Sequence, residues 1–528
     1  MKLADLCTKP VRSIPAHADL HEAEDLLKRF GDECLLVCRG EEISGLLRRH
    51  CVDKARRFSL PLCAGDLANP DLPLVKAEEE APPEKLALLL RNPMQRALVL
   101  EKGKPVGLVS AQTLLFSGLA LPRHPSLMEA VPKPLRELLA WFYLASQELG
   151  VETYLVGGAV RDLILGRLPH DLDFVVAGDP QLLGKKLEEE LGARRCKRSL
   201  FDTLKFTWGD YEIDLARARW EEYEAPAALP QVVPGNVFED LFRRDFTVNA
   251  IALALSRPHF GRLIDFFGGL KDVAAGKIRI HHPLSFVDDP TRIFRAARYA
   301  VRFGWDLSPA TRKALSLALR LGVAKLLSPA RLRNEWLRLL EEEDPRAVIE
   351  WLRGEGLLGH LFSQPAGPET LERLFKLRDT LEKEALLEAL ALLLARREEA
   401  PFCGLAEDRF SSLLEEREKL LRRREFLVSR APTSEKVFFL ERLPVQVLVA
   451  EAASDPALFP LIERALRELF AVRPSLSGKK LRQAGIPPGP KLGEMLKRLR
   501  AARLDGLVRN EAEEWSFLKK EFADVFSA

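Results

Sequence analysis

The stretch LVGGAVRDLILGRLPHDLDF, residues 155–174, constrains the fold of this chain more than any other part of the sequence. An apolar strand leads into two glycines, the helical segment VRDLILG follows at once, and HDLDFVV predicts a second strand. Glycines at a strand-to-helix turn let backbone N–H groups approach a phosphate. Ordinary tight turns also use glycine, so the turn by itself leaves both interpretations open.

The DLD element of this stretch places two carboxylates on one face of the second strand. Because residues i and i+2 of a strand point to the same side, Asp171 and Asp173 project together, while Leu172 and Phe174 enter the core. Neighbouring carboxylates repel each other unless cations lie between them, and Mg²⁺ ions would relieve that repulsion. A solvated strand edge explains the same spacing, so the spacing does not choose between the two.

Three later segments carry charges in patterns that suit phosphate chemistry. FDTLKFTWGDYEIDLARAR predicts a hairpin that turns Asp214 outward, as a third carboxylate able to activate a hydroxyl. LFRRDFTVNAIAL presents Arg243 and Arg244 ahead of an expected apolar helix that contains Asn249. In DDPTRIFRAARYAVRF, three arginines recur on one face of a predicted helix: Arg292, Arg295 and Arg298. Arginine makes bidentate contacts with phosphates and base edges.

A glycine turn, paired carboxylates and arginine clusters together suit the transfer of a nucleotide from a nucleoside triphosphate to a hydroxyl. The three motifs LVGGAVRDLILGRLPHDLDF, RRDFTVNAIAL and DDPTRIFRAARYAVRFGW, in this order, resemble the motif series of class II tRNA nucleotidyltransferases and bacterial poly(A) polymerases. The resemblance is close over residues 154–305 and weaker in the tail. Asp288 stands where that family often has glutamate.

The resemblance implies a role for each matching residue. Asp171 and Asp173 would bind Mg²⁺, and Asp214 would be the third carboxylate, although it matches a variable stretch of the family. Asp289 and Arg292 would read the Watson–Crick edge of C or A in place of a template, since the first offers acceptors and the second donors. The nucleotide-binding set would be Gly157, Gly158, Arg161, Arg244, Asp289, Arg292, Arg295 and Arg298.

At 528 residues the chain is too long for a single core. The segment VRSIPAHADLHEAEDLLKRFGDECLLVCRGEEISGLLRRHCVDKA is repeated more loosely by LPLVKAEEEAPPEKLALLL and RALVLEKGKPVGLVSAQTLL. These two units resemble cystathionine-β-synthase-type (CBS) domains in tandem, which implies an adenine nucleotide as a ligand and a homodimer formed through the CBS pair. Many such pairs are only structural, and neither unit shows a ligand motif, so both interpretations stay open. We expect a multidomain α+β protein with an α/β CBS pair, a mixed nucleotidyltransferase sheet with helices, and all-α RNA-binding domains. The expected parts are the CBS pair (1–120), a linker and helix (121–150), the palm-like catalytic domain (151–272), a helical nucleotide-recognition neck (273–345) and a helical tRNA-binding body and tail (346–528).

The C-terminal segment concentrates positive charge, although the net charge of the chain is only +3. Residues 471–510 hold ten Lys or Arg against two acidic residues, Glu494 and Asp505. This segment resembles the tail of many enzymes of the family, and its glycine-rich PPGP loop and basic helix would meet RNA phosphates. A solvated helix face with glycine caps explains the same pattern, so both interpretations stay open.

The chain shows no run of about 20 apolar residues and no secretion signal, which predicts a cytoplasmic protein without a membrane anchor. Its seven cysteines are expected to be free thiols. Cys34, Cys38, Cys51 and Cys63 crowd together, but their spacing fits small buried hydrophobes better than a zinc site.

The resemblance therefore implies a Mg²⁺-dependent enzyme that extends the 3′ end of tRNA with CCA, or with its final A, from CTP and ATP and releases pyrophosphate. The segment RWEEYEAPAALPQVVPGNVFED has the full length of a loop that helps this family change from C to A, which argues against CC-only addition. A poly(A) polymerase shares every motif and is the alternative. A CBS-based adenine-nucleotide sensor with an inactive transferase core is less favoured, because Asp171, Asp173 and Arg244 are intact.

Overall fold

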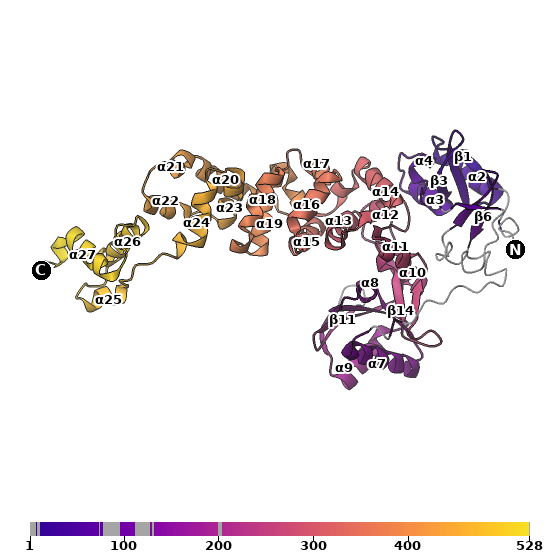
Figure 1. The fold of residues 1–528 in the computed structure, drawn as a ribbon, viewed down its shortest axis with the longest axis horizontal. Coiled ribbons are helices and arrows are strands. Elements are labelled where there is room, and N and C mark those ends of the chain that lie inside the picture. The colour runs from indigo at the N-terminus through magenta and orange to yellow at the C-terminus, as the bar shows by residue number, and fades with distance from the viewer. Residues whose placement is uncertain are drawn as a thin grey trace. The chain divides into compact units, whose positions relative to one another are not determined.

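A computed structural model describes residues 7, 11–72, 74–77, 96–110, 127–128, 131–198 and 203–526. The chain divides into two units, Met1–Leu327 and Ser328–Ala528. The first unit holds all the strands of the described residues, and the second is built from helices (Figure 1).

The N-terminal module contains two three-stranded sheets of the same topology, ordered β1-β2-β3 and β4-β5-β6. In each sheet the first two strands are parallel and the last two form an antiparallel hairpin. The elements are β1 (Ser13–Pro15), α2 (Leu20–Phe30), β2 (Cys34–Arg39), β3 (Glu42–Arg48), α3 (Arg49–Arg57), α4 (Ala64–Leu67), β4 (Leu74–Lys76), β5 (Arg96–Glu101) and β6 (Lys104–Ser110). The repetition confirms the two similar units predicted from the sequence. The segment of the second unit that corresponds to α2 lies outside the described residues.

The two small sheets share a core. Leu36 and Leu46 of the first pack in one cluster with Leu98 and Leu108 of the second, and Cys34 is buried in the same cluster. Burial raises the pKa of the Cys34 thiol. This agrees with the prediction that the cysteines of this region act as small apolar side chains.

A seven-stranded mixed sheet forms the head, in the order β15-β14-β7-β8-β11-β10-β9. β8 is parallel to β11 and antiparallel to β7, which confirms the predicted mixed sheet. The strands are β7 (Glu152–Val156), β8 (Asp171–Ala177), β9 (Arg194–Arg198), β10 (Leu204–Trp208), β11 (Tyr211–Arg217), β14 (Ile251–Ala254) and β15 (Leu263–Asp265).

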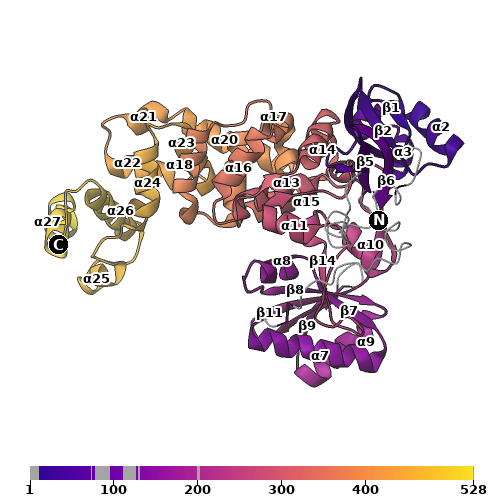
Figure 2. The ribbon, with the colours of Figure 1, turned by 45° about the vertical axis from the view of Figure 1, so that its right-hand side comes forward.

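Helices cover both faces of the head sheet (Figure 2). α7 (Lys133–Leu149) and α9 (Pro180–Leu191) lie against one face, and α8 (Gly158–Ile164) lies against the other. The ring of Phe142 on α7 stacks on Phe174 of β8 with centroids 3.8 Å apart. Since side chains alternate along a strand, the neighbours of Phe174 in β8 point to the face that carries α8.

The prediction of an apolar helix after RRDFTV is wrong. Thr247–Asn249 makes a single 3₁₀ turn, and β14 follows directly at Ile251. β14 lies inside the sheet between β15 and β7, and all four of its residues are buried. A strand covered on both faces reads as a continuous apolar run, which the pattern of the sequence does not distinguish from a buried helix.

A hairpin and a group of helices continue the first unit beyond the head. The hairpin is formed by β12 (Arg219–Glu222) and β13 (Gln231–Pro234), which pair antiparallel and enclose the proline-containing loop. The further elements are α10 (Val237–Phe242), α11 (Gly269–Ala275), β16 (Lys277–Ile278), α12 (Ser285–Asp288), α13 (Thr291–Phe303), β17 (Asp306–Leu307), α14 (Pro309–Arg320) and the 3₁₀ turn Val323–Leu326.

Among its described residues the second unit is entirely helical, as predicted. Its helices are α15 (Pro329–Leu340), α16 (Pro345–Gly354), α17 (Leu357–Leu361), α18 (Pro368–Lys376), α19 (Lys383–Leu394), α20 (Glu407–Leu421), α21 (Arg424–Val428), α22 (Thr433–Leu440), α23 (Val445–Ser454), α24 (Phe459–Arg467), α25 (Gly478–Gln483), α26 (Pro490–Leu504), α27 (Glu511–Glu521) and α28 (Ala523–Phe526). In the described part of the chain, every helix is too short or too polar to span a membrane.

Candidate active site

The carboxylates of the DLD element lie as predicted at the start of β8. Asp171 is exposed and Asp173 half-buried, whereas Leu172 and Phe174 are buried. The parallel pairing of β8 with β11 sets Asp214 directly opposite Asp173. Side chains opposite each other in a sheet share a face, so the two aspartates on β8 and Asp214 lie together on the α8 side.

The surroundings of Asp173 make a strongly charged site. The protein packed around its carboxyl raises its pKa, the guanidinium of Arg244 lowers it, and the nearby Asp214 and Asp171 raise it again. The nearest cation is Arg244, whose Nη1 lies 3.9 Å from Oδ2 of Asp173. A carboxylate whose pKa is raised by neighbouring carboxylates favours a bound cation.

The donor set fits a magnesium ion that takes some of its ligands from a substrate. Within the described ranges, no group of three or more His, Cys, Asp or Glu side chains is arranged to hold a metal. Mg²⁺ is commonly held by one or two carboxylates together with phosphate oxygens and water. Asp171 and Asp173, side by side on β8, supply such a pair.

Asp214 faces a cation of its own. Lys205, its partner in the β10–β11 hairpin, places Nζ 2.9 Å from Oδ1 and 2.6 Å from Oδ2 of Asp214. The hydrogen bond to Asp214 raises the pKa of Lys205. The sequence predicted the outward position of Asp214, but it gave no indication of this ion pair.

The glycine turn lies against the charged site. Gly157 has φ 74° and ψ −137°, and a Cβ there would lie 2.5 Å from Nη1 of Arg244 and 3.3 Å from Oδ2 of Asp173. A side chain at this position would displace the arginine or the carboxylate. Gly158 is more open, since its added Cβ would lie 3.5 Å from Nη2 of Arg161. The absence of a side chain at Gly157 is therefore required by the site itself.

Arg161 is packed inside the head and is 4% exposed. Its Nη1 donates to Oδ1 of Asn249 at 2.6 Å, and its Nε donates to Asp162 at 2.9 Å. The guanidinium also lies over the rings of Phe303 and Tyr299, with its Cζ 4.7 and 5.2 Å from their centroids. Arg161 therefore connects the glycine turn to Asn249 and to α13.

A buried carboxylate that the motif analysis missed holds the two arginines of RRD. Asp240 is fully buried and accepts hydrogen bonds from Arg243 at 2.8 Å and from Arg244 at 3.1 Å. Burial raises the pKa of Asp240, but the guanidinium groups of Arg244 and Arg243 outweigh it and leave the pKa lowered. Its spacing of three and four residues from the arginines is the signal that could have revealed it.

Side chains of other elements hold two of the three arginines that α13 carries on one face. Arg292 is 5% exposed, its Nη1 donating to Ser285 Oγ at 2.6 Å and its Nη2 to the carbonyl of Arg243 at 2.8 Å. Arg295 pairs with Asp245 at 2.6 Å, and Arg298 is half-buried. Most residues of α13 are buried, so a buried arginine here needs partners from other elements.

Asp289 lies at the start of α13, as predicted. Its Oδ1 accepts hydrogen bonds from the backbone N–H of Thr291 at 3.0 Å and from the Thr291 hydroxyl at 2.7 Å. The backbone N–H of Arg292 donates to the carbonyl of Asp289 at 3.1 Å. Asp289 and Arg292 therefore occupy one turn, and Thr291 fixes the Asp289 carboxylate through its Oδ1.

The network around Asp245 makes part of the stability of the head dependent on pH. Burial raises the pKa of Asp245, but Arg295 and Asn249 outweigh it and hold the pKa at about 2. A folded-state pKa below the unfolded value stabilises the protein by about 2 kcal/mol above pH 4, and this is lost as the pH falls towards 2. We expect Asp245→Asn to lower the thermal midpoint at pH 7 and to reduce its further fall between pH 4 and 2.5.

Thermal unfolding of both proteins across that range measures the difference, with Asp210→Asn as the control because Asp210 is an exposed turn residue. Parallel pH curves for the Asp245 variant and the wild type would contradict this account of Asp245.

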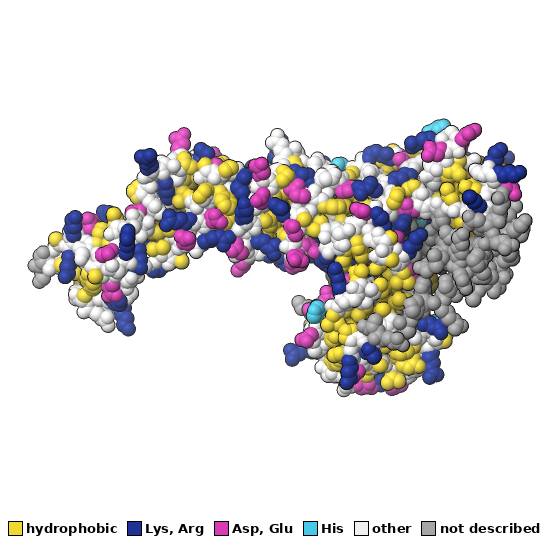
Figure 3. Space-filling model, in the orientation of Figure 1, with side chains coloured by type: hydrophobic (Ala, Val, Ile, Leu, Met, Phe, Trp, Pro, Cys, Tyr) yellow, Lys and Arg dark blue, Asp and Glu magenta, His cyan; other side chains and the backbone are white. Residues whose placement is uncertain are grey.

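Part of the basic charge of the tail is paired. Arg500 bonds Glu441, Arg503 bonds the buried Glu514 at 2.6 Å, and Lys480 bonds Glu511 at 2.5 Å. On the face that Figure 3 shows, Lys and Arg side chains alternate with Asp and Glu along the second unit. The positive concentration seen in the sequence is therefore partly balanced by acids from other helices.

Comparison with known proteins places these elements in a family. Residues 153–279 match the family described as "Poly A polymerase head domain", and residues 306–383 match "Probable RNA and SrmB- binding site of polymerase A". The A-adding tRNA nucleotidyltransferase of Geobacter sulfurreducens is 30% identical over 97% of this chain, which spans 63% of that relative's length. The A-adding tRNA nucleotidyltransferase of Halalkalibacterium halodurans is 30% identical over 71% of this chain and 90% of its own length.

The solved structure of the Thermotoga maritima CCA-adding enzyme complexed with tRNA is also similar. It superposes with a TM-score of 0.62 at 28% identity, and the match covers 76% of this chain and 99% of that one. The chain therefore belongs to the family of tRNA nucleotidyltransferases whose catalytic head is shared with poly(A) polymerases.

Proposed function

We propose that this protein is a template-independent nucleotidyltransferase that adds the 3′-terminal CCA, or its final A, to tRNA from CTP and ATP. The observation that carries the proposal is the contact between the Gly157 turn, Asp173 and Arg244, where carboxylates and a cation meet a turn that has no side chain. The match over 97% of this chain to a relative named for A addition supports the final A. CTP is a further substrate if the whole CCA is built.

Asp171 and Asp173 are the proposed ligands of Mg²⁺. Bound there, the ions would polarise the α-phosphate and neutralise charge on the leaving pyrophosphate. Arg244, the cation nearest to Asp173, would contact the same phosphates. Gly157 keeps the space between them clear, and Gly158 continues the turn into α8.

In the reaction the 3′-hydroxyl of the tRNA forms a new bond from its oxygen to the α-phosphorus. The bond from that phosphorus to the bridging oxygen of the β-phosphate breaks, and pyrophosphate leaves with the electron pair. The hydroxyl proton goes to Asp214, the proposed general base, or to water. Lys205 must release the Asp214 carboxylate for this role, because both of its oxygens are bonded to that lysine.

Base choice is assigned to the start of α13. The carboxylate of Asp289 is held at the start of the helix by Thr291 and would supply an acceptor, and Arg292, held by Ser285, would supply donors. Arg295 and Arg298 complete the proposed nucleotide pocket on the same helix. Arg161 contributes by fixing the glycine turn against α13, as its buried contacts indicate.

The second unit and the N-terminal module are assigned to partners. The helical body and tail, residues 346–528, would bind tRNA, and the RNA-binding family matched at 306–383 overlaps the start of this region. The repeated sheets of the N-terminal module would be a CBS pair, with an adenine nucleotide as its ligand and a homodimer formed through it. We place the enzyme in the cytoplasm, where its tRNA substrate is found.

The proposed activity predicts a defined pattern of products. We expect one A to be added to tRNA ending in C75 when ATP and Mg²⁺ are present, and nothing to be added to tRNA ending in A76. Because protein side chains select the base, addition stops when the extended 3′ end of the tRNA no longer fits the pocket. Gel analysis of tRNAs ending in N73, C75 and A76 with each labelled triphosphate separates the outcomes.

Each alternative gives a different ladder. Addition of C to the N73 tRNA followed by A identifies the complete CCA activity, which the proposal includes. Long A tracts on all three substrates would contradict it in favour of a poly(A) polymerase. Two C residues without A would also contradict it, and no incorporation at all would favour the inactive-core sensor.

A further inference from the structure

Helix α3 of the N-terminal module contacts the segment that precedes the proposed base reader. Nζ of Lys54 lies 2.6 Å from Oδ2 of Asp288, and only 22% of the Lys54 side chain and 2% of the Asp288 side chain are exposed. Asp288 is the last residue of α12 and is followed directly by Asp289. This ion pair thus joins a module without any proposed catalytic residue to the start of the nucleotide pocket.

Lys54 is the cation that bonds Asp288 directly, while Arg292 acts on the same carboxyl from farther away. The other oxygen of Asp288, Oδ1, is buried without a hydrogen-bond partner among the described residues. Nε2 of His282 lies 3.5 Å from Oδ2 of Asp288, but burial, together with nearby Lys54, holds the pKa of His282 well below its usual value, so the ring is neutral. Removing one partner of a buried ion pair leaves a charge without compensation, which displaces or protonates that group.

Helix α12, which ends at Asp288, also fixes Arg292, the second residue proposed to read the base. α12 has four residues, and its first, Ser285, accepts the hydrogen bond from Arg292. The backbone N–H of Asp289 donates to the carbonyl of Ser285 at 3.2 Å. A shift at the end of so short a helix therefore moves both residues that would read the base.

The same helix α3 holds the hairpin loop beside α12. Arg57 bonds Glu222 at 2.5 Å and donates to the carbonyl of Tyr223 at 3.1 Å. Further along this loop, the N–H of Ala227 donates to the carbonyl of Val287 in α12 at 3.0 Å. α3 thus contacts α12 directly through Lys54 and indirectly through the loop.

We infer that Lys54 is a positioning residue for nucleotide selection, which acts through Asp288 on Asp289 and Arg292. The inference rests on the proposed function, because it takes Asp289 and Arg292 as the residues that choose the base. It assigns to the N-terminal module a part in the reaction that none of the matched families describes.

Lys54→Met keeps the length of the side chain and removes its charge. On tRNA ending in C75, we expect this variant of the full-length protein to lower the ratio of kcat/KM for ATP to that for CTP by about tenfold, since small displacements of positioning groups cost factors of this order or more. The change should appear mainly in KM for ATP. Lys54→Arg should retain most of the wild-type ratio, because it keeps the cation.

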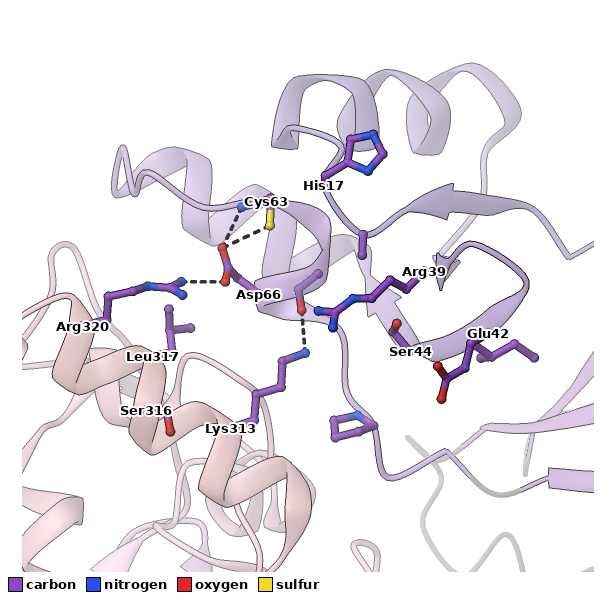
Figure 4. A pocket seen from close by; sticks show the side chains of 14 residues that line it. His17, Arg39, Glu42, Ser44, Cys63, Asp66, Lys313, Ser316, Leu317 and Arg320 are labelled. Atoms are coloured by element: carbon purple, nitrogen blue, oxygen red, sulfur yellow. Dashed lines mark hydrogen bonds and ion pairs between the residues drawn. The ribbon is translucent and has the colours of Figure 1, made fainter. Parts of the chain in front are cut away.

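A double-substitution cycle separates positioning from general stability. Lys54→Met combined with Asp288→Asn removes both charges, so the combination should recover part of the ratio lost by Lys54→Met alone. Arg320→Met is the matched control. Arg320 bonds Asp66 of α4 at 2.6 Å, so the substitution removes another ion pair of the N-terminal module (Figure 4). That pair involves neither α12 nor the β12–β13 hairpin, so this control should keep the wild-type ratio.

The outcomes distinguish the inference from the function on which it rests. Wild-type protein that prefers ATP, together with a Lys54→Met variant of unchanged ratio, overturns the inference alone. An equal fall in the ratio for Arg320→Met also overturns it, since the effect would then be general loosening of the module. Wild-type protein that transfers neither nucleotide overturns the proposed function, and the inference falls with it.

Discussion

Nucleotide transfer will fall by about 10³-fold or more when Asp173 is replaced by asparagine, and the protein will remain folded. An amide at this position loses the charge that a metal ion needs, while it keeps the size of the side chain. The Asp173 side chain is 51% exposed and has Arg244 as its nearest cation at 3.9 Å, so the fold does not depend on its charge. Asp171→Ala should have an effect of the same order.

The rate is measured under single-turnover conditions with labelled ATP and tRNA ending in C75, beside a thermal unfolding curve for each variant. Asp210→Asn is the matched control, because Asp210 is an exposed aspartate in the turn of the hairpin that carries Asp214. Transfer by Asp173→Asn within tenfold of the wild-type rate, with an intact fold, would rule out the metal assignment.

Asp240→Ala will have the largest effect on stability. The substitution leaves the guanidinium groups of Arg243 and Arg244 without their shared buried carboxylate, and breaking a buried ion pair costs about 3–5 kcal/mol. Arg243 keeps Glu221 at 3.0 Å, but Arg244 keeps only Asp173 at 3.9 Å. We therefore expect a lower thermal midpoint. At temperatures where the variant is still folded, we also expect a higher KM for ATP.

Glu189→Ala removes an exposed pair with Lys185 on α9 and serves as the control for this measurement. Such surface pairs contribute about 0–1 kcal/mol, so its midpoint should stay close to that of the wild type. Equal midpoints for Asp240→Ala and Glu189→Ala would show that Asp240 does not hold the two arginines as described.

The strand, glycine turn, helix and second strand could be predicted because local rules alone determine them. The alternation of the DLD element placed Asp171 and Asp173 on one face, and the hairpin pattern placed Asp214 outward, since side chains alternate whatever the rest of the chain does. The repeated units near the N-terminus were also visible, because each repeat is a local unit.

Features that depend on contacts distant in the sequence could not be predicted. The run after RRDFTV is continuously apolar, as in a strand or helix buried on every face. Only its place between β7 and β15 shows that it is a strand. The spacing of Arg292, Arg295 and Arg298 placed them on one helical face, but it could not show that Ser285 and Asp245 hold the first two. The pair Lys54–Asp288 likewise joins residues that no local pattern connects.

The central claim is that this chain transfers a nucleotide to the end of tRNA, and the fate of the phosphates of ATP tests it most directly. With tRNA ending in C75, we predict that label from the α-phosphate enters the tRNA once per molecule, whereas label from the γ-phosphate appears only in pyrophosphate. Label from the γ-phosphate in the RNA, or no transfer of the α-label at all, would contradict the account.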